Sequence, residues 1–87
     1  MQEVYVNGSD FDSVEEIFDY LGEELELHVT GLNALYEELT ELGDDTKITM
    51  DMSQVTDDTL LDAMEKMAEV MEDAAGENDY LEISCIE

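Results

Sequence analysis

The chain has 87 residues, of which 26 are Asp or Glu and only two are Lys or Arg, so its formal net charge at pH 7 is −24. Such a charge excludes nucleic acids and anionic membranes as electrostatic partners and favours basic proteins or cations. Because 44% of the residues are hydrophobic and proline is absent, we expect a folded domain and not an acidic disordered tail.

The length is that of one domain, residues 1–87, with a single modest core. The lone Cys85 excludes an intrachain disulfide and a cysteine-based metal cluster, and it fits a reducing compartment. The chain opens without a basic segment or a long apolar run, so we expect neither a signal peptide nor a membrane helix. The cytoplasm is therefore the expected location. We also expect no cofactor and no bound metal, and we expect the protein to be a monomer.

The first elements expected are a short strand and a helix. Residues 3–6 are β-branched and aromatic and run into Asn7-Gly8, which predicts a strand followed by a turn. Ser13 and Glu16 have the spacing of a capping box, so a helix begins directly after Ser13. An apolar stripe at helical spacing follows, and Gly22 is expected to weaken or end this helix.

A second helix and a second strand are expected next. Thr30 or Gly31 begins the helix and Gly43 stops it. Its apolar stripe consists of Leu32, Leu35, Tyr36, Leu39 and Leu42. Residues 47–52 alternate apolar and polar side chains, which is the period of a strand.

A third helix and a last strand complete the chain. The run Thr56-Asp57-Asp58 provides a cap and two carboxylates at the positive end of a helix dipole, and the helical spacing continues to Gly76. Asp62 and Lys66 form an i, i+4 pair in the favourable orientation. Three methionines, Met64, Met67 and Met71, are interpreted as core filling. Residues 80–85 alternate again and predict the final strand.

The expected order is β-α-α-β-α-β, with helical connections between successive strands. Such connections predict an α/β fold with a small three-stranded parallel sheet, right-handed crossovers and about three to four helices covering at least one face.

The stretch Gly31-Leu32-Asn33-Ala34-Leu35-Tyr36-Glu37-Glu38-Leu39-Thr40 resembles the signature helix of barstar-family ribonuclease inhibitors. The opening strand and turn, the helix over residues 13–27, and the closing helix and strand also fall where that family has them. The resemblance implies a barstar-like fold. It also implies an immunity or antitoxin function, in which the protein binds and blocks a basic, barnase-type ribonuclease and has no enzymatic activity of its own.

The resemblance also implies which residues contact the partner. Asn33, Tyr36, Glu37 and Thr40 fall on family contact positions of the second helix. Asp73 falls near the acidic contact of the last helix, and a slip of one turn in that alignment would give the role to Glu69 or Glu77.

The residues themselves support an acidic ridge on the second helix. A helix that buries Leu32, Leu35 and Leu39 turns Asn33, Glu37 and Glu41 outward at successive i+4 steps. A carboxylate placed in this way can occupy the position of a substrate phosphate and pair with the Arg, Lys and His groups of a ribonuclease site.

Three residues depart from the family pattern and bear on the choice of target. Asn33 stands where the family usually has Asp, Tyr36 replaces Trp, and Glu37 replaces a shorter Asp. These changes alter the charge pattern and the reach of the ridge, so the expected target is a diverged ribonuclease or another basic toxin.

Parts of the sequence also fit other classes of function. The chief alternative is an acidic mimic of nucleic acid that binds the nucleic-acid site of a basic toxin or of a nucleic-acid-binding protein. Selection for solubility, or a salty habitat, would also produce an acidic composition without a specific partner. Asp12-Ser13-Val14 is similar to the prosthetic-group site of acyl carriers, but Ser13 lies too early in the chain. The acids near residues 10–12 and 57–58 lack the spacing of a twelve-residue calcium loop. No Arg, a single His and no phosphate loop argue against an enzyme.

Overall fold

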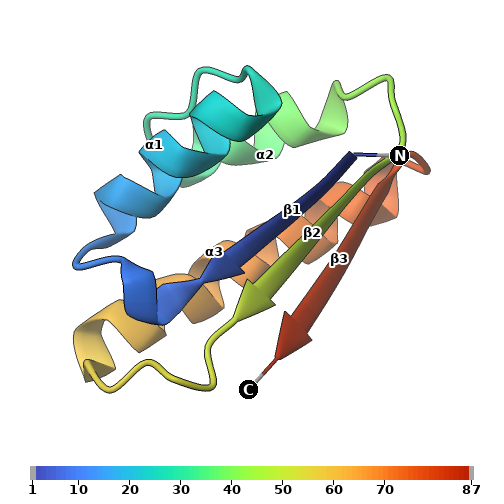
Figure 1. Cartoon of the computed structure of the whole chain (residues 1–87). Helices are drawn as coiled ribbons and strands as arrows, with labels where there is room; N and C mark the ends of the chain where they lie inside the picture. The colour runs from blue at the N-terminus through green and yellow to red at the C-terminus, as the bar shows by residue number, and fades with distance from the viewer. Residues whose placement is uncertain (1, 87) are drawn as a thin grey trace.

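The structure, a computed structural model, describes residues 2–86. They form a parallel sheet whose strands lie in chain order, β1-β2-β3 (Figure 1). The strands are β1 (Gln2–Asn7), β2 (Thr46–Asp51) and β3 (Leu81–Ile86). The helices are η1 (Gly8–Asp10), a single 3-10 turn, and the α-helices α1 (Val14–Leu25), α2 (Leu32–Thr40) and α3 (Asp58–Glu77).

The predicted α/β fold with a three-stranded parallel sheet is confirmed. Within residues 2–86 there are three α-helices, the lower end of the expected three to four. The same residues contain no helix that is both long and apolar enough to cross a membrane.

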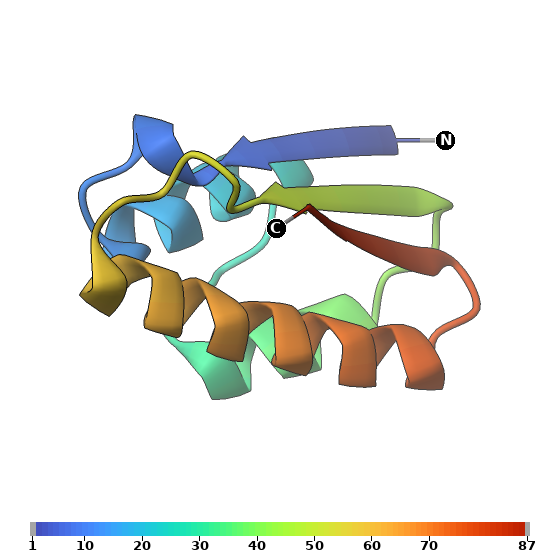
Figure 2. The same cartoon turned by 90° about the horizontal axis from the view of Figure 1, so that it is seen from below.

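One face of the sheet is buried and the other is open. Both connections step to the next strand in the same direction, so crossovers of the usual right hand place their helices on the same side. Figure 2 shows α2 and α3 together on one side of the strands. The buried face carries Val4, Val6, Ile48, Met50 and Leu81. On the opposite face, Tyr5 is 51% exposed and Ile86 is 41% exposed.

Methionine supplies much of the core. Met64, Met67 and Met71 of α3 are fully buried, as is Met50 of β2, which confirms their interpretation as core filling. A flexible thioether side chain fills irregular gaps between helices and sheet without requiring one particular shape. The carboxylates remain outside this core, because Asp51 is the only buried acidic residue in the described part of the chain.

The start of α1 follows the predicted cap. Ser13 is the N-cap, and its hydroxyl accepts the Glu16 N–H at 3.5 Å. The Glu16 carboxylate reaches back to the N–H of Asp12 at 2.8 Å, one residue earlier than in an ideal capping box. The two contacts together satisfy backbone donors at the helix start.

Gly22 does not end α1, as the helix continues to Leu25. Its carbonyl accepts the N–H of Leu27 at 2.9 Å, and Glu26 closes the turn with a left-handed φ of 56°. A Cβ on Gly22 would lie 2.9 Å from the Leu27 carbonyl oxygen. Gly22 therefore provides room for the chain that turns back after the helix, and the stop occurs one turn later than predicted.

The start and the ion pair of α3 also differ only slightly from expectation. The N-cap is Asp57 and not Thr56, and its carboxylate accepts the N–H groups of Thr59 at 2.9 Å and Leu60 at 3.4 Å. The Asp62–Lys66 pair forms at 3.4 Å, with both side chains exposed, so it adds little stability.

A buried amide connects α2, α3 and β3. Asn78 directly follows α3 and is only 6% exposed. Its side-chain NH₂ donates to the carbonyls of Leu39 and Leu42, both at 2.9 Å, and its side-chain oxygen accepts the N–H of Tyr80 at 2.9 Å. One side chain thus satisfies two carbonyls at the end of α2 and one donor at the start of β3.

We expect Asn78→Ala to destabilise the fold strongly. The substitution removes both donors and the acceptor, and each buried group left without a partner costs about 1–3 kcal/mol, so a total loss of roughly 2–4 kcal/mol is expected. Urea unfolding followed by circular dichroism measures this change. The matched control is Asn33→Ala on the exposed face of α2, for which a change within about 0.5 kcal/mol is expected. Equal losses in the two variants would contradict the role of Asn78.

Candidate protein-binding site

Helix α2 is short and its position is set mainly by tertiary contacts. Nine residues are too few for a stable isolated helix, and its N-cap, Gly31, offers no side chain for capping. Leu35 and Leu39 are fully buried in the core. The Asn78 amide binds carbonyls at the other end of the helix. The inner face is therefore anchored at its centre and at its C-terminus.

The five residues predicted as contacts on the second helix lie on the outward face of α2, with Glu41 at the C-cap position just after its last residue. With 3.6 residues per turn they cover an arc of about 140°, in the order Tyr36, Thr40, Asn33, Glu37 and Glu41. We call these five residues the α2 arc. All are exposed except Thr40, which is half-buried, and Tyr36 is exposed over 36% of its surface. The Thr40 hydroxyl donates to the Glu37 carbonyl at 2.8 Å, so it stabilises the helix end as well as lining the arc.

The candidate acids of α3 differ in their positions relative to α2. Asp73 and Glu77 are exposed i, i+4 neighbours, and Glu77 follows the row of Lys66 and Val70. That row faces α2, because Lys66 lines a hollow together with Leu32 of α2. The structure therefore places Glu77 on the α2 side of α3 and Asp73 on its outermost line.

Glu69, the third acid considered, lies four residues before Asp73, on the row of α3 furthest from α2 among the three acids. It lines a hollow with Cys85 of β3, away from α2. The arrangement brings the α2 arc and Glu77 onto one surface, with Asp73 next to Glu77, and leaves Glu69 outside it.

Neither lysine neutralises this surface. Lys66 forms its ion pair with Asp62 and lies about three helical turns before Glu77, and Lys47 projects from the open face of the sheet. The acidic groups of the α2 arc and of Glu77 thus remain available to an external cation.

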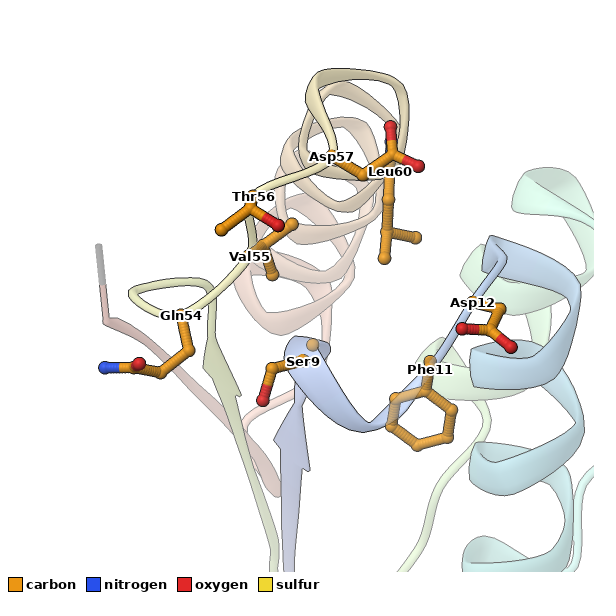
Figure 3. Close-up of a pocket in the computed structure, with 9 residues that line it drawn as sticks. Ser9, Phe11, Asp12, Gln54, Val55, Thr56, Asp57 and Leu60 are labelled. Atoms are coloured by element: carbon orange, nitrogen blue, oxygen red, sulfur yellow. The ribbon is translucent and has the colours of Figure 1, made fainter.

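A hollow of about 200 Å³ lies where the carboxyl ends of β1 and β2 meet the start of α3, a place where α/β sheets often bind ligands (Figure 3). It is lined by Gly8, Ser9, Phe11, Asp12, Gln54, Val55, Thr56, Asp57 and Leu60. Two of these residues are acidic and none is basic, so the hollow is unsuited to anions. Among residues 2–86, no group of three or more His, Cys, Asp or Glu side chains has the arrangement of a metal site.

A hydrogen-bonded cluster on the open face of the sheet was not predicted. The Asp51 carboxylate at the end of β2 accepts from the Ser53 hydroxyl at 2.6 Å, from the Ser53 N–H at 3.0 Å, and from the Tyr5 hydroxyl of β1. The Ser53 hydroxyl, the Tyr5 hydroxyl and the Ser53 N–H, in that order, hold the pKa of Asp51 below its ordinary value. The cluster fastens β1 to the end of β2.

Two tyrosines near this cluster are held in their neutral form. The hydrogen bond to Asp51, followed by burial and the charges of Asp51 and Asp10, raises the pKa of Tyr5 above its ordinary value. Burial, followed by the charges of Glu24 and Asp10, raises the pKa of Tyr20. The Tyr20 hydroxyl donates to the Tyr5 carbonyl at 3.2 Å. Both hydroxyls thus donate to groups of the sheet strands.

Asn78 and Asp51 were the important residues missing from the predictions. The signal for Asn78 is an Asn three residues before a strand, whose side chain can accept the backbone N–H two residues on in an Asx turn, as it does from Tyr80. Asp51-Met52-Ser53 has the same i, i+2 signal, in which the carboxylate accepts the Ser53 N–H. Their partners on other elements depend on how the strands and helices pack, and no local sequence pattern indicates those partners.

We expect Asp51→Asn to remove a pH-dependent part of the stability. Because the folded pKa of Asp51 lies below its unfolded value, the carboxylate stabilises the native state above the unfolded pKa, and this contribution is lost as the pH falls through the folded pKa. The wild-type advantage over the variant should be constant between about pH 6 and 8 and should shrink below about pH 4. Urea unfolding at each pH measures it. Asp45→Asn, an exposed change of equal charge, is the control, and a parallel acid response of both variants would contradict the assignment.

Comparison of the sequence with known proteins identifies no relative of this chain. A scan against protein-family models finds no match, and a search of curated proteins also finds none. The resemblance to the barstar family therefore remains a prediction that rests on the residues of α2 and on the order of the elements.

Proposed function

We propose that this protein is a barstar-like inhibitor of a basic, barnase-type ribonuclease, acting as an immunity protein that blocks the active site of its target. The observation that carries the proposal is the α2 arc: an outward row of polar, acidic and aromatic side chains on a short helix that the core and Asn78 hold in place. A rigidly held surface loses little conformational entropy on binding, which favours high affinity.

The proposed mechanism begins with long-range attraction. A net charge of −24 steers a basic enzyme toward the inhibitor and raises the association rate at low salt. Docking then brings the α2 arc over the active site, where the Glu37 carboxylate takes the place of the substrate phosphate and pairs with Arg, Lys or His groups. Such charge-assisted bonds are strongest once water is excluded.

The remaining residues of the surface complete the contact. The exposed Tyr36 ring supplies apolar area with a hydroxyl at its tip, which suits the centre of an interface. Glu77 extends the acidic surface onto α3, with Asp73 beside it at the periphery. Asn33 contributes hydrogen bonds without charge, so the preferred target presents fewer cations opposite the first turn of α2 than opposite Glu37.

Binding alone performs this function, with no reaction catalysed by the chain and no cofactor or metal. Protection of the producing cell requires the inhibitor where the enzyme is made, so we place it in the cytoplasm as a monomer that forms a one-to-one complex.

A second candidate is a general acidic mimic of nucleic acid that binds another basic toxin or a nucleic-acid-binding protein. It is favoured by the spread of exposed carboxylates over all three α-helices and the loops, beyond the surface that includes the α2 arc. Such a mimic would bind many basic proteins through charge alone, with steep salt dependence.

We expect stoichiometric inhibition of one ribonuclease in a panel of barnase-type and other microbial enzymes, measured by RNA cleavage at low salt and at about 0.3 M salt. A desolvated set of charge pairs is screened less than exposed charges, so the inhibition should persist at the higher salt. Weak inhibition of every basic enzyme that disappears with salt would support the mimic and contradict the inhibitor.

We expect Glu37→Gln to weaken the complex by roughly 2 kcal/mol or more, about thirtyfold in Kd, because it leaves a desolvated cation of the enzyme unpaired. The matched control is Glu24→Gln on α1, which removes the same charge at an exposed position and should change the affinity by less than about 0.5 kcal/mol. Isothermal titration at both salt concentrations measures the two values. Equal small losses would refute a localised contact on the α2 arc.

A further inference from the structure

The two outer strands of the sheet differ in whether side chains bond to their outward backbone groups. At β1, the Tyr20 hydroxyl of α1 donates to the outward carbonyl of Tyr5 at 3.2 Å, and the Gln2 side chain donates to the Glu24 carbonyl of α1 at 2.6 Å. At β3, no side chain within residues 2–86 bonds to the backbone of Ile83. Helix α1 thus closes one edge, whereas the middle of the other edge, at Ile83, is not closed by a side chain of residues 2–86.

The open edge of β3 presents hydrogen-bonding groups. Thr46 and Met52 donate their N–H groups to the carbonyls of Tyr80 at 2.8 Å and Ile86 at 2.7 Å, so the even-numbered residues of β3 face β2. In a parallel ladder the intervening residues point the other way. The N–H and C=O of Ile83, at the middle of β3, therefore point outward from the sheet, which is the position that another strand would pair with.

An acidic groove lies alongside this edge. Two adjoining hollows, of about 340 and 320 Å³, share Met52 and Glu65 and follow α3 on its β3 side. Buried Met52 and Ala68 line them on the inside, and the exposed carboxylates of Glu65, Glu69 and Glu72 surround them. The side chain of Cys85 on β3 donates to the Glu72 carboxylate at 3.6 Å, which shows how near this row lies to the strand.

We propose that β3 binds an extended basic peptide segment of a partner protein as a fourth strand of the sheet. Addition of a peptide strand uses main-chain hydrogen bonds for affinity and alternating side chains for specificity. The charge decides the occupant, since a second copy of a chain with a net charge of −24 would bring like charges together, whereas a basic segment is attracted.

The geometry specifies an alternating sequence. A strand beside β3 points every second side chain toward α3. A Lys or Arg there lays its aliphatic stem over Met52 and Ala68 and brings its charge to the glutamates of the groove. The intervening side chains lie on the open face near Ile86, which is 41% exposed, so β-branched apolar residues fit them.

This surface is separate from the α2 arc. It lies on the β3 side of α3, and the α2 arc lies beyond the opposite side. The proposal therefore does not depend on ribonuclease inhibition, and a variant of Glu37 should leave peptide binding unchanged.

The test uses a capped synthetic hexapeptide of alternating Lys and Val and the full chain labelled with ¹⁵N. On binding, amide exchange of Ile83 should slow by about tenfold or more, because its N–H gains a hydrogen bond and loses contact with water. Chemical-shift changes should centre on β3 and on the facing side of α3. A peptide of identical charge in which every backbone nitrogen is methylated lacks the necessary donors in either strand direction and should bind at least about tenfold more weakly.

Matched charge variants separate the groove from the overall field. The triple variant E65Q/E69Q/E72Q should weaken binding by roughly tenfold, because it removes three ion pairs, whereas E15Q/E23Q/E24Q on α1 removes the same charge and should have a much smaller effect. Both variants reduce self-repulsion, so folding is retained. Equal affinity for the N-methylated peptide, equal losses in the two triple variants, or shifts centred on α2 would each overturn the proposal.

Discussion

Two crossovers of the same hand, connecting strands in strict chain order, place α2 and α3 on one side of the sheet, with α1 against the β1 edge. This constraint determines where the molecule is buried and where it is open. The covered face takes the valines, isoleucine and methionine of the strands, and the helices must bury their apolar stripes against it. On the uncovered face and at the two outer strand edges, only side chains can provide hydrogen-bond partners for the exposed polar groups. Tyr20 does so at β1, and the Tyr5–Asp51–Ser53 cluster does so on the open face.

A second constraint is the separation of charge from the core. With almost every acidic side chain on the surface, the chain has no ion-pair network to stabilise it, and only Lys66 forms a salt bridge among the described residues. Stability depends on apolar contacts, and methionine provides a large share of them. A core of this composition tolerates small shifts of the helices because thioether side chains adapt their shape. The specific contacts that fix position are therefore polar and few, with Asn78 the clearest case.

Much of the fold could be predicted from local patterns. The β-branched and aromatic run at residues 3–6 and the alternating apolar and polar residues at 47–52 predicted the two strands. Apolar residues at helical spacing predicted that Leu35 and Leu39 of α2 are buried. The outward direction of Glu37 follows from the same spacing. Gly22 was misread because a glycine that makes room for a returning chain has the same local signature as one that ends a helix. The open edge of β3 could not be predicted, since strand order and the side chains that close an edge arise only from tertiary packing.

The attachment of α2 through Asn78 has an evolutionary consequence. The amide binds main-chain carbonyls, which every residue possesses, and it makes no use of the side chains on the outward face of the helix. Substitutions at the exposed residues of the α2 arc, that is, all but the half-buried Thr40, can therefore accumulate without changing how the helix is anchored. Among related sequences these outward residues should vary while Asn78, Leu35 and Leu39 stay the same, so divergence should concentrate on one side of a helix whose other side is constant.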